Sequence, residues 1–337
     1  MLRFRSILPY SLTFIFGAGA MLGVTALTDN DRLSSTVLCG QTLRDMNSSY
    51  SYIKPLVACD VGATVETPEL ASLKTKVTTL INSAKAEEQV DVASMYFRDL
   101  DSGQWTAVNL DETYRPASLF KVPLLMAYLK IAEQHPEILK QEIEVAADPT
   151  PNMAQDIAPE KSLNVGETYT VDELLHYMIA YSDNRAEVLL TNYVDTAVLD
   201  DIFGDLQVPI PASMTEQYTL SARSYSRFFR TLYNASYLGD TMSEKALELL
   251  SGVTYPDGLR AGVPSDVKIA HKFGEAKVTL QNGKSGHELH DCGIVYEAHP
   301  YLICVMTRGE MVSDLEELIA NVSQTVYDDR NEAAVSK

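Results

Sequence analysis

The chain has 337 residues, of which 46% are hydrophobic and 22% charged, and its formal net charge is −19. A chain of this length can bury a substantial core, and its composition is that of an ordinary globular protein. Because a nucleic-acid partner requires a clustered basic surface, the acidic balance argues against nucleic-acid binding.

The first residues differ from the rest. Arg3 and Arg5 precede a stretch from Ile7 to Leu27 that contains no charged residue, which is long enough to cross a bilayer as a helix. Basic residues ahead of such a helix stay in the cytoplasm, so the remainder of the chain would lie outside. We predict that residues 1–28 anchor the protein in the cytoplasmic membrane as a single span; a cleaved signal peptide, followed by secretion, is the alternative.

Residues 29–68 are polar apart from a short apolar patch, and we predict an extracytoplasmic stalk with some docking structure. An even number of cysteines in an exported chain is compatible with disulfides. Cys39 and Cys59 both lie in the predicted stalk, and a disulfide between them would stabilise this region. Cys292 and Cys304 flank a predicted hairpin and would be cross-strand neighbours or buried thiols; the sequence leaves this open.

The remaining chain alternates between helical and strand patterns. Two strands follow an opening helix, a mostly helical block comes next, and strands return after Pro264. Hairpin turns are predicted at 282–283 and 297–300. The predicted helices span 69–88, 119–133, 171–192, 221–235, 243–250 and 313–327, and the predicted strands span 90–100, 104–110, 267–272, 276–281, 293–296 and 301–308.

This order of elements predicts an α+β fold, an α/β sandwich. The simplest packing is one antiparallel sheet of about five strands, drawn from both chain ends and flanked by helices, with an inserted all-helical subdomain. The domain would cover residues 69–328, with the insert at about 118–255 and a flexible tail at 329–337. A site is expected in the cleft between sheet and insert.

Ser118 and Lys121 lie three residues apart at the start of a predicted helix and therefore share a face. A serine hydroxyl is a poor nucleophile until a base takes its proton, and a lysine can do so when burial lowers its pKa. Free backbone N–H groups at the helix start would stabilise an oxyanion. We predict Ser118 as the nucleophile, although the spacing alone also fits a helix cap followed by a solvated lysine.

Two further motifs favour the catalytic interpretation. Ser182-Asp183-Asn184 stands between two helical runs, where short side chains can project into a cleft. There Ser182 would relay a proton and Asn184 would orient a substrate amide. Lys272 ends an apolar strand and would face the cleft, while Gly274 would let substrate lie against the strand edge.

In this order the three motifs resemble the active-site elements of the penicillin-recognising serine enzymes, the class A β-lactamases and D-Ala-D-Ala peptidases. Their flanks, at 116–123, 166–175 and 259–264, are also similar, and the resemblance covers about Leu70 to Tyr327. It implies a β-lactamase/transpeptidase-like fold and a serine hydrolase that acts through an acyl-enzyme on a small peptide or β-lactam, without a cofactor.

The resemblance also implies roles for individual residues. Lys121 would be the acylation base and Ser182 the proton relay. Lys272 would set the electrostatics of the pocket, and the oxyanion would sit between the backbone N–H groups of Ser118 and Glu275.

The sequence departs from the class A pattern in the loop after Ser-Asp-Asn. Those enzymes carry a glutamate in a Glu-x-x-Leu-Asn run that activates the deacylating water, and no such run is present here. Between Leu206 and Ser221 the only carboxylate is Glu216. Without a deacylation base, an acyl-enzyme formed from a β-lactam would persist, as in a peptidase; a true β-lactamase that uses Glu216 is the alternative.

A second departure is Phe273, where the family has a hydroxyl residue that binds the substrate carboxylate. Loss of this donor removes a charge-assisted hydrogen bond worth about 1.5–3 kcal/mol. Arg260, His271 and His290 are candidates to replace it, unless the substrate lacks the carboxylate.

His287, His290 and Cys292 are metal-competent side chains that lie close together in the sequence. On a strand, His290 and Cys292 share a face while His287 points the other way. Because no second cluster supplies the remaining ligands at a recognised spacing, we expect no metal. We expect a strand that borders the cleft, with His290 near the substrate.

An exported enzyme of this kind would lie beside peptidoglycan, so the sequence predicts a serine hydrolase related to cell-wall peptides. A true class A-type β-lactamase is one alternative. A catalytically silent wall-binding or sensor module is another, but it has no need of a nucleophile and base together.

Overall fold

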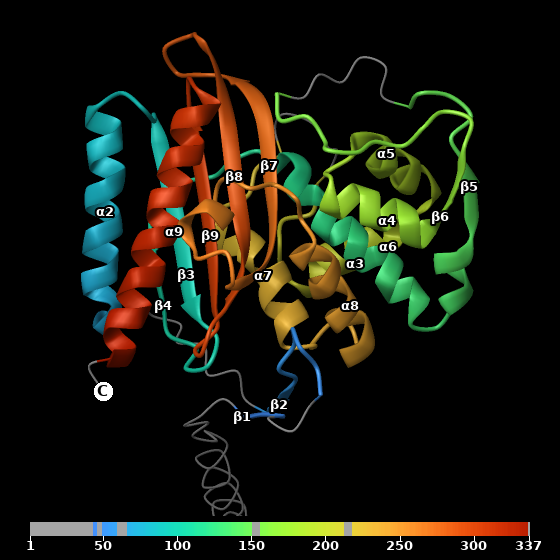
Figure 1. The fold of residues 1–337 in the computed structure, drawn as a ribbon, viewed down its shortest axis with the longest axis horizontal. Helices are drawn as coiled ribbons and strands as arrows, with labels where there is room; N and C mark the ends of the chain where they lie inside the picture. Colours follow the sequence, from blue (N-terminus) through green and yellow to red (C-terminus); the bar gives the residue numbers. More distant parts are fainter. Residues whose placement is uncertain (1–42, 46–48, 59–65, 150–155, 212–217, 336–337) are drawn as a thin grey trace, which may run out of the picture. The chain divides into compact units, whose positions relative to one another are not determined.

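The computed structural model describes residues 43–45, 49–58, 66–149, 156–211 and 218–335 (Figure 1). The predicted anchor or signal at 1–28, both stalk cysteines and Glu216 lie outside the described residues. Within the described ranges, no helix combines the length and apolar character that crossing a membrane requires. Residues Gln41–Lys337 make up one compact unit.

The centre of this unit is one antiparallel sheet with strand order β4-β3-β9-β8-β7. Strands from the start and end of the domain lie side by side in it, as predicted, because β3 pairs with β9 along its whole length. The predicted fold class is therefore confirmed. The five strands are β3 (Val92–Asp99), β4 (Trp105–Val108), β7 (Lys268–Thr279), β8 (Ser285–Tyr296) and β9 (Tyr301–Gly309).

Alternation along the strands gives the sheet two apolar faces. Met95 and Phe97 of β3 belong to the core that is shared with α2 (Ala71–Ala86) and α9 (Val312–Val335). Tyr96 belongs to the other core, on the side where α7 (Ala222–Tyr233) packs. Figure 1 shows α2 and α9 together along one face of the sheet and the helical block on the other side.

The helical block is built around α3 (Lys121–Ala132), in which ten of the twelve residues are buried. A helix that is apolar on all sides belongs inside a fold, and α4, α6 and α8 pack around α3. The surrounding elements are α4 (Val171–Ala180), α5 (Asn184–Tyr193), α6 (Thr196–Asp205), α8 (Asp240–Ser251) and the small sheet of β5 (Glu142–Glu144) and β6 (Thr168–Thr170). Short 3-10 helices are η1 (Pro68–Leu70), η2 (Ala117–Phe120), η3 (Pro136–Lys140) and η4 (Arg260–Gly262).

Several elements differ from the sequence prediction. The predicted helix 171–192 is divided into α4 and α5, the predicted strand 293–296 is the end of the longer β8, and β5 and β6 were not predicted. The predicted strands 267–272 and 276–281 are one strand, because the residues between them continue to pair with β8. Helix α6 was not predicted. Helix α9 does not end near 327 with a flexible tail; it continues to Val335, and Lys76 of α2 forms ion pairs with Asp329 and Glu332.

The described part of the predicted stalk packs against the rest of the compact unit. Strands β1 (Leu43–Arg44) and β2 (Leu56–Ala58) pair with each other, and Arg44 donates to the carbonyl of Leu100 over 2.8 Å. The backbone N–H groups of residues 51–53 donate to the carboxylate of Glu244, and Ile53 is fully buried. The predicted docking structure is therefore part of the folded unit.

Gly262 provides a test of the packing of α9. A Cβ at this position would lie 2.4 Å from both the Ala320 carbonyl oxygen and the Ser323 Cβ. We expect Gly262→Ala to lower the free energy of unfolding by about 1–3 kcal/mol because the core cannot yield to the extra carbon without strain. Urea denaturation measures this change. Gly204→Ala in α6, where a Cβ meets nothing within 4 Å, is the matched control, and an equal loss in both variants would contradict the prediction.

Candidate active site

Ser118 lies in η2, the 3-10 turn that leads directly into α3. The residue before it, Ala117, has a φ of 49°. Left-handed backbone is unfavourable for a residue with a side chain, and it concentrates at functional sites. The turn places the Ser118 hydroxyl 2.8 Å from the ammonium nitrogen of Lys121, so the two predicted residues do meet.

Lys121 is fully buried, yet all its nearest partners are polar. Its ammonium group donates to the Asn184 amide oxygen over 2.7 Å and to the Ser182 carbonyl over 2.9 Å. The carboxylate of Glu187 lies 3.2 Å away. Burial lowers the pKa of Lys121 below 10.5, and the charge of Glu187 opposes part of that shift.

The Ser182 hydroxyl lies between two lysines. Lys272 donates to it over 2.9 Å and Lys121 over 3.3 Å. Lys272 is also fully buried, and its pKa lies well below the ordinary value because of burial and, secondarily, the charge of Lys121. Ser182 has a φ of 57°, a second left-handed residue at this site. All four predicted catalytic side chains are therefore in one hydrogen-bonded cluster.

Asp183, the middle residue of the Ser-Asp-Asn motif, fixes the local backbone. It caps α5 by accepting from the Arg185 N–H over 2.8 Å, and it accepts from the Leu163 N–H over 2.8 Å. These contacts hold the start of α5 against the loop before β6, so that Asn184 points at Lys121.

Strand β7 is at the edge of the sheet and passes close to the Ser118 turn. A Cβ on Gly274 would lie 2.9 Å from the Leu119 nitrogen and 3.1 Å from the Ser118 nitrogen, so glycine permits this approach. The carbonyl of Phe273 accepts from Lys272 over 2.8 Å and therefore faces the site. Residues two apart on a strand present their backbone groups to the same side, so the Glu275 N–H also faces the site.

The ring of Phe273 does not stand open to a ligand. It is 6% exposed and stacks on Tyr255, with ring centroids 4.1 Å apart. The ammonium nitrogen of Lys272 lies 4.0 Å from the ring centroid. Phe273 therefore forms an apolar wall beside Lys272.

Arg260 and His290 do not join the cluster, in contrast to their predicted substrate-binding role. Arg260 donates to backbone carbonyls of its own loop, including Val267 over 2.7 Å. His290 is fully buried, and its Nε2–H donates to the Arg115 carbonyl over 2.9 Å. It therefore supports the segment before Ser118 from beneath, and burial lowers its pKa.

The third candidate donor, His271, is also directed elsewhere. Its Nδ1 lies 2.9 Å from the buried carboxylate of Asp291, which also accepts from the Leu259 N–H. This contact ties β7 to β8 and to the loop before η4.

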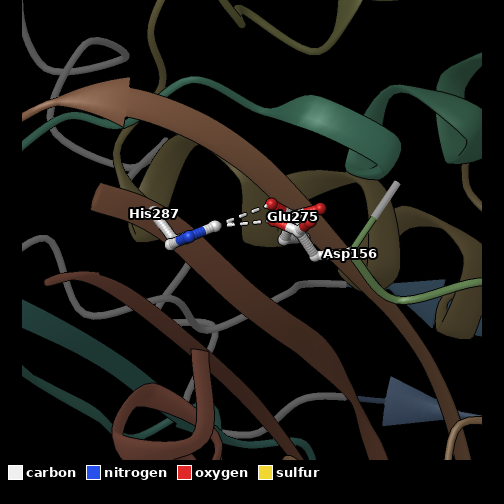
Figure 2. A group of neighbouring side chains, drawn as sticks. All are labelled: Asp156, Glu275 and His287. Atoms are coloured by element: carbon white, nitrogen blue, oxygen red, sulfur yellow. Dashed lines mark hydrogen bonds and ion pairs between the residues drawn. The ribbon is translucent and has the colours of Figure 1, made fainter. Parts of the chain in front are cut away.

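The metal-competent cluster considered in the sequence does not assemble. Cys292 forms a disulfide with Cys304 directly across on β9, and His290 is on the opposite face from His287. Instead, His287 meets Glu275 and Asp156 (Figure 2), with its Nδ1 3.0 Å from the Glu275 carboxylate and 3.4 Å from that of Asp156.

Among the described residues, Asp156, Glu275 and His287 are the group whose ligand atoms converge enough to hold a metal ion, within 4.8 Å of one another. The amine of Lys277 lies 2.9 Å from the Asp156 carboxylate. In this structure the group therefore links β7 and β8 to the segment at Asp156 through contacts between polar side chains.

Sequence analysis missed Glu187. It is three residues after Asn184 on α5, which is the spacing that puts two side chains on one helix face. Glu187 lies within the motif's own helix and not in the loop that follows, where the class A pattern has its glutamate.

The sheet, the inserted helical block and the cluster around Ser118 define a β-lactamase-like hydrolase. Residues 72–329 match the model of the Beta-lactamase enzyme family, and the chain belongs to this family. This confirms the resemblance on which the sequence interpretation rested.

Three similar proteins illustrate the relationship. A β-lactamase of Bacteroides uniformis is 22% identical over 84% of this chain and 99% of that protein. The structure of PBP-A is 23% identical, with a TM-score of 0.64 over 79% of this chain and 98% of its own. A class A β-lactamase from Mycobacterium abscessus is 19% identical, with a TM-score of 0.63 over 77% of this chain and 99% of its own.

Gly274 provides a test of the site's geometry. We expect Gly274→Ala to slow acylation by penicillin about 100-fold, because the new carbon displaces the Ser118 turn and small misplacements of reacting groups are costly. Stopped-flow or quenched-flow acylation rates measure this. Gly204→Ala is the control, and unchanged acylation in Gly274→Ala would show that the turn is not held by this contact.

Proposed function

We propose that this protein hydrolyses amide bonds through an acyl-Ser118 intermediate, with β-lactams and cell-wall peptides as its substrate class. The observation that carries the proposal is the 2.8 Å contact between the Ser118 hydroxyl and a fully buried Lys121 of lowered pKa. A lysine that merely stabilised the fold would not need to be buried against a serine hydroxyl.

In the acylation step, neutral Lys121 takes the proton of Ser118 as the oxygen attacks the substrate carbonyl. The resulting oxyanion is stabilised by the backbone N–H groups of Ser118 and Glu275. The carbon–nitrogen bond then breaks, and the leaving nitrogen takes the proton of the Ser182 hydroxyl. Lys121, protonated in the first step, returns a proton to Ser182 over the 3.3 Å contact between them.

Deacylation needs a group that takes a proton from water. The sequence suggested that no carboxylate was available, which favoured a persistent acyl-enzyme. Glu187 changes this inference, because its carboxylate lies 3.2 Å from Lys121. We assign it the role of proton acceptor, directly or through Lys121, so that the acyl group is released and the enzyme turns over.

The setting outside the cytoplasm is part of the proposal. Disulfides persist in oxidising compartments, which supports export of a domain that contains the Cys292–Cys304 bridge. Together with the predicted anchor or signal at 1–28, this would put the domain beside peptidoglycan. One variant of PBP-A has been solved as an acyl-enzyme complex with penicillin G, which makes penicillin the natural probe.

The first test is intact-protein mass spectrometry after addition of benzylpenicillin. We expect a covalent adduct on the wild-type protein, present at early times and lost later as the acyl group is hydrolysed. Ser118→Ala should form none, because the nucleophile is absent. Ser102→Ala, at an exposed turn, is the control. An adduct on Ser118→Ala would refute the assignment of the nucleophile.

The second test separates the two steps by their pH dependence. Acylation should rise with pH through an inflection below 10.5, because the base form of Lys121 is the neutral amine. In Glu187→Gln a negative charge beside the ammonium is lost, so the pKa of Lys121 falls and the inflection moves to lower pH. Deacylation should slow by about 100-fold or more, the typical contribution of a general base.

Single-turnover kinetics with a chromogenic β-lactam measures both steps. The control is Glu137→Gln, since Glu137 is exposed on η3. If Glu187→Gln shifts the acylation profile but deacylates like the wild type, Glu187 is only a counter-ion of Lys121.

A further inference from the structure

A cavity of about 620 Å³ lies between α7 and the β3–β4 hairpin, and none of its described lining residues belongs to the catalytic cluster. Among the described residues that line it, four are arginines and one, Asp205, is acidic. The lining thus carries an excess of positive charge in a chain whose net charge is −19. The four are Arg98 of β3 and Arg223, Arg227 and Arg230 of α7.

The sequence of α7 builds this surface. Arg223, Arg227 and Arg230 follow one another at spacings of four and three residues, which puts them on one face of the helix. The opposite face, with Phe228 and Phe229, is buried in the core. Like charges at this spacing repel one another, so the arrangement is unfavourable for the helix alone.

Two of the arginines are held in place by neutral partners. The guanidinium carbon of Arg223 lies 4.7 Å from the centroid of the Trp105 ring. Arg227 donates to the backbone carbonyls of Leu206, over 3.0 Å, and Gln207. Within the described part of the chain, neither forms an ion pair with a carboxylate. Their positive charges are thus oriented without being neutralised.

We infer that this cavity binds an anion that carries two or more phosphate or carboxylate groups. Arginine presents several donors in a planar fork that matches such oxyanions, and guanidinium groups fixed in advance lose little entropy on binding. Arg223 and Arg227 come from neighbouring turns of α7, and a cavity of about 620 Å³ is much larger than a single small ion needs. The inference does not depend on the proposed hydrolase activity.

The test is isothermal titration calorimetry of the full-length protein at low salt, with inorganic pyrophosphate and with citrate as separate probes. We expect at least one to bind, with an affinity that falls as sodium chloride is added. Arg223→Gln and Arg227→Gln should each weaken binding by about 10-fold or more, since each removes a charge-assisted hydrogen bond. Preference for one probe identifies the oxyanion.

Three further proteins make the outcome decisive. Lys140→Gln removes one positive charge at an exposed site outside the cavity and should bind like the wild type. Ser118→Ala should also bind normally, because the catalytic cluster is separate. Arg223→Lys keeps the positive charge but loses the planar set of guanidinium donors, so it should also bind weakly. Because this variant retains a cationic side chain, it tests the role of the guanidinium group independently of any misfolding in the glutamine variants. No binding of either probe, or equal binding by the wild type and both glutamine variants, would overturn the inference.

Discussion

The burial of two lysine side chains against one serine hydroxyl is the constraint on which the rest of this site depends. Neither Lys121 nor Lys272 is exposed at all, and removing two cations from water costs several kcal/mol each unless polar partners replace the solvent. Those partners come from the start of α5 and from β7. The sheet edge and the helical insert must therefore pack so that their polar backbone and side-chain groups lie within hydrogen-bonding distance of the two lysines.

Several contacts around the site position the polar groups that the buried lysines require. Gly274 lets β7 pass against the Ser118 turn, His290 supports that turn from below, and Asp183 fixes the start of α5. Left-handed backbone at Ala117 and Ser182 is unfavourable locally and is held by these contacts. Residues that do not touch the hydroxyl of Ser118 thus determine where it lies.

The order of local signals predicted the fold, and the three motifs together with their resemblance to a known family predicted Ser118, Lys121, Ser182 and Lys272. Strand alternation, helix caps and the three motifs are readable within a few residues; the capping box of Thr170 and Glu173 at the start of α4 is one such local signal. What the sequence prediction missed depends on contacts between distant segments. The extension of α9 accompanies ion pairs with α2, and the burial of His290 depends on the segment that packs above it.

The role of Glu187 also depends on a contact between distant segments, because the carboxylate comes from α5 and its partner Lys121 from α3. This contact has the largest consequence for the proposed chemistry. Burial and, after it, the charge of Lys121 lower the pKa of Lys272 well below its ordinary value, whereas the lowering of the Lys121 pKa by burial is opposed by the charge of Glu187. The ammonium group of Lys121 lies 3.2 Å from the Glu187 carboxylate and donates to the Ser118 hydroxyl over 2.8 Å. In the proposed mechanism Lys121 acts as a base only when neutral, and the carboxylate of Glu187, 3.2 Å away, can take its proton. In that mechanism Glu187 both stabilises the charge of Lys121 and offers the route by which that charge is removed.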